Sequence, residues 1–325
     1  MNEFALIANY FQRPCLDAAV LLGVGDDCAV LRVPPDEVLL VSTDLLVAGR
    51  HFPESTPPFD IGYKTLAVNL SDLAAMGARP LGVTLGLALP NVDPAWLEAF
   101  AAGFYTLAAE HAVCLVGGDT VKSPQLTLAV TVMGRANPAQ ILRRSSAQPG
   151  DWIAVTGTVG DAGLGLCSIL EPNSAPASLS PADLTFLHSR LNRPSPRLAE
   201  GHRLAEFAHA AIDISDGLLQ DLQHILTASG VGAVIEQAKI PLSPAAQAWF
   251  QADPTAQVLP LSAGDDYELL FTLKPQDWPQ VDFPATVIGR IEAEPGLRVL
   301  DAEGQPLSLL PHGFDHFPPN RTSQP

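Results

Sequence analysis

The chain has 325 residues, of which 47% are hydrophobic and 16% charged, and it carries a formal net charge of −17. This length and composition predict a globular protein large enough for two cores. The excess of acidic residues argues against a nucleic-acid partner, because phosphate backbones are bound mainly through Lys and Arg. The lack of an unbroken apolar run of 18 residues argues against a membrane span.

The cysteines and the amino-terminal segment indicate a cytoplasmic protein. Cys15, Cys28, Cys114 and Cys167 form no CxxC pair, so we expect all four to be reduced residues of the core. Residues 1–14 lack the basic stretch, apolar stretch and small-residue cleavage site of a signal peptide.

The first acidic motifs lie beside predicted strands. We expect a helix over residues 3–12 and strands over 28–33 and 38–41, with Asp26–Asp27 before the first strand and Ser42–Asp44 ending the second. Hydroxyl and carboxylate oxygens at a strand end suit a hard cation. The same composition is also common in turns, so this motif alone leaves both interpretations open.

The segment from Asp60 to Pro80 predicts a buried helix, with Asp60 able to cap its start and Gly77 its end. Asn69 and Asp72 lie three residues apart and therefore on one side of this apolar helix. Polar groups there cost free energy unless a partner satisfies them. A solvated helix edge and a ligand-binding face both remain open.

The next elements alternate strand and helix. A strand over 81–89 and a helix over 94–111, capped by Asp93, precede a strand that runs into Gly117–Thr120. We expect Asp119 at the carboxyl end of that strand, where α/β folds gather their binding sites. A strand over 126–133 is expected to pair with it.

A polar, proline-containing stretch over residues 134–151 predicts a domain boundary near residue 140. It contains Arg143 and Arg144, which can face ATP phosphates or belong to a solvated linker. A strand over 152–156 and a glycine-rich turn before a helix follow, but there is no GxxxxGK[ST] and hence no P-loop.

Two further acidic motifs lie in the second half. Asp213, Ser215 and Asp216 precede a helix over 218–228; Ser215 or Asp216 can cap it, which leaves Asp213 unexplained. Residues 264–268, with the sequence GDDYE, come directly before a strand.

The acidic motifs together predict metal-dependent phosphoryl transfer. Carboxylates and hydroxyls without Cys or His clusters favour Mg²⁺ over Zn²⁺, and several converging carboxylates repel one another unless cations neutralise them. Several Mg²⁺ ions with a polyphosphate meet that need. The six aspartates concerned are Asp27, Asp44, Asp72, Asp119, Asp213 and Asp216.

The ordered motifs resemble the thiamine-monophosphate kinases of the aminoimidazole ribonucleotide synthetase and selenophosphate synthetase superfamily. They are VGDDCAVL, VSTDLLVAGRHF, NLSDLAAMGARP, GGDT, IDISDGL and GDDYELLFT, and the match spans residues 3–317. The resemblance implies a two-domain α/β (α+β) fold of the aminoimidazole ribonucleotide synthetase type. Its amino-terminal sheet would form a barrel-like homodimer core, and its activity would be the ATP-dependent conversion of thiamine monophosphate to thiamine diphosphate.

The resemblance also implies roles for particular residues. The Mg²⁺ ligands would be Asp27, Ser42, Thr43, Asp44, Asp72, Asp119, Asp213 and Asp216, of which Asp44, Asp72, Asp119 and Asp213 would be catalytic. ATP would be bound by Gly118, Asp119, Arg144 and Ser215, and thiamine monophosphate by His51, Asp265 and Phe314. Tyr105 can stack on adenine, although packing within its helix is favoured.

One position departs from the family pattern. The motif usually reads GGEDYEL, and Asp265 stands here in place of the longer Glu, so the contact to substrate would be shorter, mediated by water or lost. The remaining alternatives are a superfamily enzyme for another substrate, such as an amidine or a selenium donor, and a non-catalytic acidic metal-binding scaffold.

The expected organisation has three parts. Residues 1–140 would form the ATP- and Mg²⁺-binding dimerisation domain and residues 141–317 a domain that completes the active site, followed by a disordered tail over 318–325. The expected small-molecule partners are ATP and thiamine monophosphate.

Overall fold

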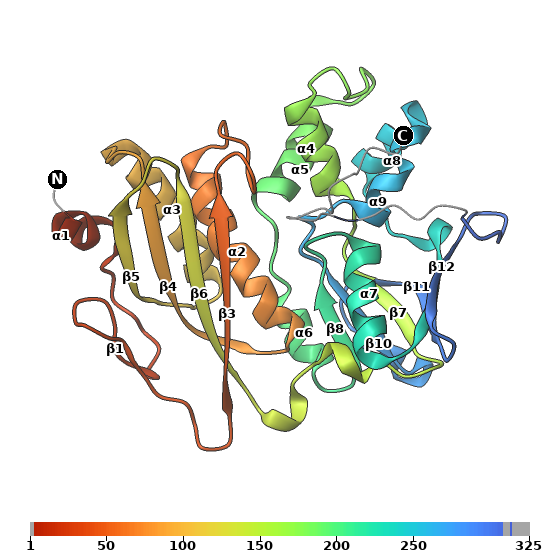
Figure 1. Cartoon of the computed structure of the whole chain (residues 1–325), viewed down its shortest axis with the longest axis horizontal. Coiled ribbons are helices and arrows are strands. Elements are labelled where there is room, and N and C mark those ends of the chain that lie inside the picture. The colour runs from red at the N-terminus through yellow and green to blue at the C-terminus, as the bar shows by residue number, and fades with distance from the viewer. Residues whose placement is uncertain (1–2, 308–312, 314–325) are drawn as a thin grey trace, which may run out of the picture.

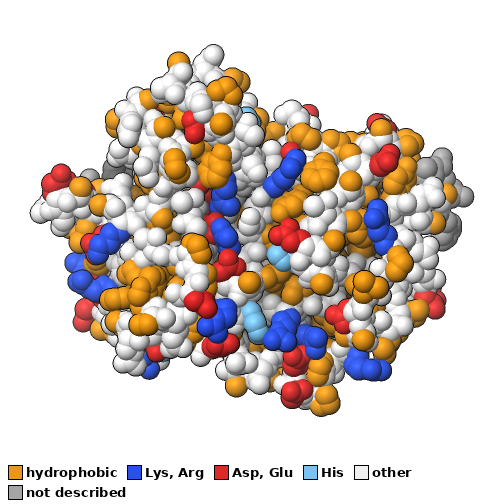
Figure 2. All heavy atoms as spheres, turned by 180° about the vertical axis from the view of Figure 1, so that it is seen from behind, with side chains coloured by type: hydrophobic (Ala, Val, Ile, Leu, Met, Phe, Trp, Pro, Cys, Tyr) orange, Lys and Arg blue, Asp and Glu red, His pale blue; other side chains and the backbone are white. Residues whose placement is uncertain are grey.

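The structure is a computed structural model that describes residues 3–307 and residue 313. Figure 1 shows two sheets side by side, one from each half of the chain. Helix α2 (Pro58–Ala75) covers the first sheet and also contacts strand β8 and helices α5 and α6 of the second half. Along the face seen in Figure 2, acidic and basic side chains are interspersed where the halves meet.

The amino-terminal sheet has four strands in the order β3-β6-β4-β5. β6 pairs antiparallel with β3 and β4, whereas β4 and β5 are parallel. Buried and half-buried residues alternate along β6, as expected for a strand with one face on a core. The bounds are β3 Val38–Val47, β4 Arg79–Leu89, β5 Leu115–Lys122 and β6 Thr127–Ala136.

Two glycines let α2 and α3 (Pro94–Glu110) pack backbone against backbone. A Cβ atom on Gly62 would lie 2.0 Å from the carbonyl oxygen of Phe100, and one on Gly103 would lie 1.9 Å from that of Phe59. Only glycine permits so close an approach. The contact fixes α2, which carries the polar motif of the sequence, against the amino-terminal core.

A disulfide fastens the amino-terminal segment to the first sheet. This segment contains α1 (Glu3–Leu6), the π-helical turn η1 (Ile7–Phe11), β1 (Val20–Leu22) and β2 (Val30–Leu31). Cys15 is bonded to Cys114, with 5.5 Å between their Cα atoms. The expectation of four reduced cysteines is therefore wrong for this pair; the two lie 99 residues apart in sequence, so their contact has no local signature.

The second sheet has six strands in the order β12-β9-β11-β7-β10-β8. All neighbours are antiparallel except β12 and β9. The bounds are β7 Trp152–Thr156, β8 Ala210–Asp213, β9 Gly232–Glu236, β10 Leu269–Leu273, β11 Ala285–Glu292 and β12 Gly296–Leu300.

Helices and short turns connect the strands of this second half, and α7 packs against β8 and β10. The α-helices are α4 Asp161–Leu170, α5 Pro181–Asn192, α6 Leu198–Leu204, α7 Leu218–Ser229, α8 Pro244–Ala252 and α9 Leu259–Ser262. The 3₁₀ turns are η2 Pro138–Gln140, η3 Arg144–Ser146, η4 Gln237–Lys239, η5 Pro254–Val258 and η6 Pro275–Gln280. Within the described part of the chain, no helix has the length and apolarity that crossing a membrane requires.

A buried glutamate ties the loop before β10 to two helices. Glu268 is 1% exposed and accepts hydrogen bonds from Arg197 at 2.6 and 2.7 Å, from Arg190 at 2.8 Å and from the Thr156 hydroxyl at 2.6 Å. A buried carboxylate is tolerated only when it is paired and hydrogen-bonded in this way. The network therefore fixes residues 264–268 against the second core.

Several local expectations are corrected by long-range pairing. β3 extends to Val47 and β5 to Lys122, so Asp44 and Asp119 lie within strands rather than at their ends. β6 pairs with β3 and β4, not with β5. Asp60 caps nothing and instead pairs with Arg193 at 2.5 Å.

Candidate active site

Helix α2 joins the two halves through two adjacent residues. The Ser71 hydroxyl donates to Asp213 Oδ2 at 2.7 Å, which links α2 to the end of β8. Asp72 Oδ2 accepts from the Ser42 hydroxyl at 2.6 Å, which links α2 to β3. We call the line of contact between α2, β3 and the end of β8 the seam. It brings together carboxylates that are far apart in the sequence.

Asn69 has a positioning role in the seam. Its side chain is fully buried, accepts from the Asp44 main-chain N–H at 3.2 Å and donates to the Thr65 carbonyl oxygen at 3.0 Å. The polar face of α2 is therefore not a solvated edge. Asn69 satisfies the backbone of β3 beside Asp44, and Asp72 alone of the two polar residues remains partly exposed.

The carboxylates of the seam destabilise one another's charged forms. Burial, and then the charges of Asp72 and Asp216, raise the pKa of Asp44 to about 6. Burial, and then the charge of Asp72, raise the pKa of Asp213 to about 8. The pKa of Asp72 is likewise raised by burial, while the Ser42 hydrogen bond and the Arg144 charge act in the opposite direction.

An oxygen-rich site of this kind fits a hard divalent cation. Carboxylate and hydroxyl oxygens are the ligands that Mg²⁺ prefers, and a cation would favour the charged carboxylates that burial and mutual repulsion oppose. Within residues 3–307 and 313, however, no three Asp, Glu, His or Cys side chains form a ready-made metal group. The donors are near one another, but they are not assembled around one ion.

Asp221, which the sequence interpretation missed, organises the loop after β8. Its Oδ2 accepts from the main-chain N–H groups of Ser215, Asp216 and Gly217 at 3.0 to 3.1 Å. Burial, and then the charge of Asp216, raise its pKa to about 7. Neither Ser215 nor Asp216 caps α7, whose N-cap is Gly217. The signal available was an acidic residue in the first turn of a helix.

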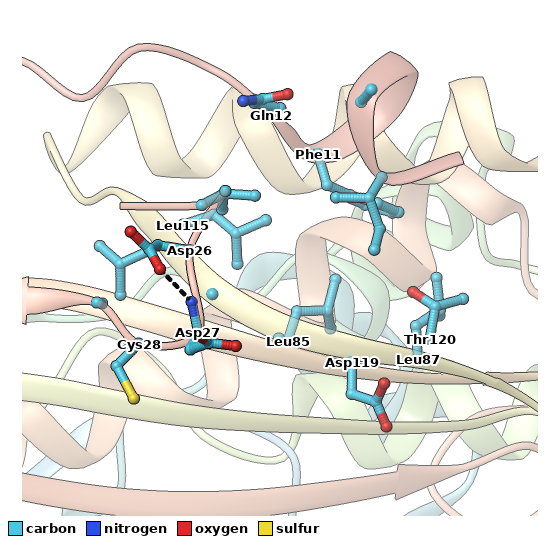
Figure 3. Close-up of a pocket in the computed structure, with 18 residues that line it drawn as sticks. Phe11, Gln12, Asp26, Asp27, Cys28, Leu85, Leu87, Leu115, Asp119 and Thr120 are labelled. Carbon is cyan, nitrogen blue, oxygen red and sulfur yellow. Dashed lines mark hydrogen bonds between the residues drawn. The ribbon is translucent and has the colours of Figure 1, made fainter. Parts of the chain in front are cut away.

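A cavity of about 520 Å³ lies beside the first sheet, between the amino-terminal segment and β4 and β5. Phe11, Leu85 and Leu115 provide apolar walls, and Asp27 and Asp119 provide exposed carboxylates. Figure 3 shows Phe11 and Gln12 on one side of this cavity and Asp119 on the other. The cavity therefore offers an apolar part and an acidic part.

Gly118 lets β5 lie close against β4 at the wall of this cavity. Its φ is +155°, and a Cβ atom there would lie 2.1 Å from the carbonyl oxygen of Leu85. Any side chain at this position would therefore displace β4 or β5. The Gly117–Gly118 pair exposes main-chain atoms next to Asp119, as a site for an anionic ligand requires.

The loop over residues 264–268 approaches the seam from the second half. The Asp265 N–H donates to the Ser215 carbonyl oxygen at 2.9 Å, and Asp265 Oδ1 lies 2.9 Å from Lys64 Nζ. His51 lies after β3, where its Nδ1 accepts from the Val47 N–H at 3.0 Å. Phe314, the third residue expected to bind thiamine monophosphate, lies outside the described residues.

Comparison with known proteins identifies the family. The model for the AIR synthase related protein N-terminal domain matches residues 25–136, and that for the C-terminal domain matches residues 148–302. Thiamine-monophosphate kinase of Escherichia coli K12 is 44% identical over 97% of this chain and 98% of its own length. The chain belongs to the thiamine-monophosphate kinase family.

Solved structures agree with this membership. A thiamine-monophosphate kinase from Stenotrophomonas maltophilia K279a matches with a TM-score of 0.81 and 46% identity, covering 89% of this chain and 93% of that one. AaThiL complexed with AMPPCP and TMP matches with a TM-score of 0.79 and 31% identity, covering 88% and 89%. The expected two-domain fold of the aminoimidazole ribonucleotide synthetase type is confirmed.

The expected thiamine-monophosphate kinase residues fall into two groups. The seam brings together Ser42, Asp44, Asp72, Asp213 and Asp216, and the cavity brings together Asp27, Gly118 and Asp119. Ser215 follows β8, and its main-chain contacts are with Asp221 and Asp265. Arg144 acts on the charge of Asp72 and so lies on the seam side. Thr43 is not brought in, because strand alternation turns its side chain away from Ser42 and Asp44; its hydroxyl contacts that of Thr131 at 2.9 Å.

Proposed function

We propose that this chain transfers the γ-phosphoryl group of ATP to the phosphate of thiamine monophosphate, giving ADP and thiamine diphosphate. The observation that carries the proposal is a pair of hydrogen bonds, from Ser42 to Asp72 and from Ser71 to Asp213, which bring the two carboxylates to one seam through adjacent residues of α2. Membership of the thiamine-monophosphate kinase family and the AaThiL complex with AMPPCP and TMP support the choice of substrates.

The nucleotide would occupy the cavity beside β4 and β5. Its apolar walls suit a base, and the exposed main chain at Gly118 is available to phosphate oxygens. Arg144, whose charge acts on Asp72, is the arginine of the 143–144 pair that we assign to the phosphates, with Ser215 on the other side of the seam. This would place the γ-phosphate between the cavity and the seam.

Mg²⁺ ions would be held by the acidic residues of both groups. The ligands we assign are Asp27, Ser42, Asp44, Asp72, Asp119, Asp213 and Asp216. Thr43 is left out of this set because its hydroxyl contacts Thr131 instead. The raised pKa values of Asp44 and Asp213 support this assignment, because they mark carboxylates that lack a compensating positive charge. When bound, Mg²⁺ supplies the positive charge that offsets both the carboxylates and the two phosphates.

The reaction depends mainly on the alignment of the two reacting phosphates. An oxygen of the acceptor phosphate forms the new P–O bond to the γ-phosphorus while the bond to the β-bridging oxygen breaks and its electron pair leaves with ADP. The acceptor is already anionic near neutral pH, so no strong general base is needed. Asp44, Asp72, Asp119 and Asp213 would therefore act by orienting and neutralising the reacting phosphates.

We further propose a cytoplasmic homodimer in which residues 1–140 dimerise and residues 141–317 complete the site. β3 is an edge strand of its sheet, and Leu39, Val41 and Leu45 along it are about half exposed. Such an apolar edge is normally covered, since it otherwise promotes association. Sedimentation velocity of the purified chain tests this directly: a monomer at micromolar concentration would contradict the dimer.

Product analysis tests the proposed reaction. Purified protein is incubated with ATP, Mg²⁺ and thiamine monophosphate, and the thiamine species and nucleotides are separated. We expect equal amounts of thiamine diphosphate and ADP, and no product when free thiamine replaces the monophosphate. Hydrolysis of ATP without formation of thiamine diphosphate would contradict thiamine monophosphate as the phosphoryl acceptor, but it would not contradict the fold.

A further inference from the structure

A buried lysine lies beside Asp265, one of the residues expected to bind thiamine monophosphate. The Lys64 side chain is 2% exposed, and its Nζ lies 2.9 Å from Asp265 Oδ1. Nζ makes no hydrogen bond of good geometry with any residue in the described part of the chain, so the charge of Asp265 is its main compensation. Because an unpaired buried ammonium is costly, the ion pair constrains both side chains.

Asp265 depends on such contacts for its orientation. Its φ is +67°, a left-handed backbone conformation that costs free energy in a residue other than glycine. Its N–H donates to Ser215, and the Tyr267 hydroxyl donates to its Oδ1 at 3.3 Å. The main chain is therefore held by the loop after β8, whereas the carboxylate is held by Lys64 and Tyr267.

The spacing of α2 places this pair at a defined position along the seam. Lys64 and Ser71 are seven residues apart, so they lie on one face of the helix about two turns, or roughly 10 Å, apart. Both contact the second half of the chain, Ser71 through Asp213 and Lys64 through Asp265. One face of α2 thus has Ser71 beside the proposed site of phosphoryl transfer and, two turns away, Lys64 in its ion pair with Asp265.

We propose that Lys64 is a positioning residue for the acceptor: it fixes the Asp265 carboxylate at the end of the site that binds the cationic, amino-bearing rings of the substrate. A fixed carboxylate can accept a hydrogen bond from an amino group and attract a cationic ring. The proposal rests on the proposed function, and it assigns Lys64 to binding of the organic part of the acceptor rather than to phosphate transfer.

The position of the Lys64 charge predicts different effects on the binding of the two substrates. Lys64 acts through Asp265 and not on the nucleotide cavity, whose lining residues come from other elements. Loss of Lys64 should therefore weaken binding of thiamine monophosphate and leave binding of ATP unchanged. A merely structural lysine would instead change stability and both substrates together.

The test is a double-mutant cycle on the full-length chain. KM for each substrate and kcat are measured for wild type, Lys64→Met, Asp265→Asn and the double variant, with Lys239→Met as the control because Lys239 is an exposed lysine paired with Glu236. We expect each single change to raise KM for thiamine monophosphate at least tenfold, with KM for ATP and kcat within about threefold. The KM of the double variant for thiamine monophosphate should be no higher than that of the more impaired single variant. Lys239→Met should have the same KM as wild type.

The outcomes separate this role from the proposed reaction. Wild-type protein that makes no thiamine diphosphate refutes the reaction. If wild-type protein is active but Lys64→Met leaves the KM for thiamine monophosphate unchanged, only the role of Lys64 is refuted. The same holds if the effects of the two changes are additive. Should Lys64→Met fail to fold, Lys64→Gln takes its place: its amide can still donate to Asp265, so we expect an intermediate acceptor KM, and a wild-type value would count against the proposal.

Discussion

The two acidic regions of the molecule differ in what satisfies their carboxylates. In the seam, Asp72 and Asp213 accept hydrogen bonds from serine hydroxyls, and Asp213 is only 4% exposed. In the cavity, Asp27 and Asp119 are exposed and line an open volume. The seam is therefore organised by the protein itself, whereas the cavity carboxylates are placed to meet a ligand.

Because of this difference, stability and activity should respond separately in the two regions. A buried carboxylate is costly to keep charged, so a change in the seam should alter the free energy of unfolding as well as catalysis. A change to an exposed carboxylate should alter catalysis alone.

The largest effect should come from Asp44→Ala. Removing one electrostatic contributor from a preorganised site typically costs about 10²–10³ in kcat, and Asp44 lies next to Asp72 and Asp216. We expect the loss of activity to be accompanied by a rise in the free energy of unfolding above pH 6, because the variant also removes a charge whose pKa is raised to about 6 by burial and by its neighbours. Steady-state kinetics and thermal unfolding check this, with the exposed Asp282→Ala as control.

Asp119→Ala should show the behaviour of the cavity. We expect a loss of activity of similar order, about 10², accompanied by a raised KM for ATP and an unfolding temperature equal to that of wild type. A clear drop in stability would break the contrast, since it would mean that Asp119 also supports the fold.

Glu268→Gln should destabilise the fold by about 3 kcal/mol, because removing one partner of a buried ion pair leaves the other uncompensated. The charges left behind belong to Arg190 and Arg197. Urea unfolding measures the change. The exposed pair of Glu236 and Lys239 supplies the matched control: Glu236→Gln should cost less than about 1 kcal/mol, and an equal cost for both variants would contradict the role of burial.

Mg²⁺ should stabilise the protein more at pH 8.5 than at pH 5.5. Asp44, Asp221 and Asp213 have pKa values raised to about 6, 7 and 8, so their contribution to stability is present below their unfolded pKa and is lost as pH rises through the folded values. Mg²⁺ favours the charged forms and so offsets that loss. At 100 times its Kd the ion would add about 2.7 kcal/mol; an equal shift in unfolding temperature at both pH values would contradict this.

The smallest effect should come from Ser71→Ala, which removes a single hydrogen bond to Asp213. Hydrogen bonds to charged groups contribute about 1.5–3 kcal/mol, and a protonated Asp213 would reduce that value. We therefore expect a loss near 1 kcal/mol at pH 6 and a larger one at pH 9. Chemical denaturation at the two pH values measures it, and a cost independent of pH would count against the raised pKa of Asp213.

The sequence was sufficient for features whose cause is local. The capping of α3 by Asp93, the strand Trp152–Thr156 and the helix from Leu218 follow from capping residues and periodicity. The six aspartate motifs could be found because charged residues beside apolar runs are conspicuous. Their distribution between seam and cavity could not be found, because it depends on which strands become neighbours.

The remaining features depend on contacts between distant segments. The pairing of Cys15 with Cys114, of Lys64 with Asp265 and of Glu268 with Arg190 each joins residues separated by many elements. Nothing in the local sequence of these residues distinguishes a paired partner from an unpaired one. Asn69 is the instructive middle case: its polarity was visible as an anomaly, but its partner, the Asp44 N–H, required the fold.

The most direct test is a single-turnover reaction with ATP labelled at the γ-phosphate, thiamine monophosphate and an excess of enzyme. If the phosphoryl group passes directly between substrates aligned at the seam, the label appears only in the terminal phosphate of thiamine diphosphate, one for each ADP formed, and none remains on the protein after denaturation. Label bound covalently to the protein, or released as inorganic phosphate while thiamine monophosphate is unchanged, would contradict direct transfer.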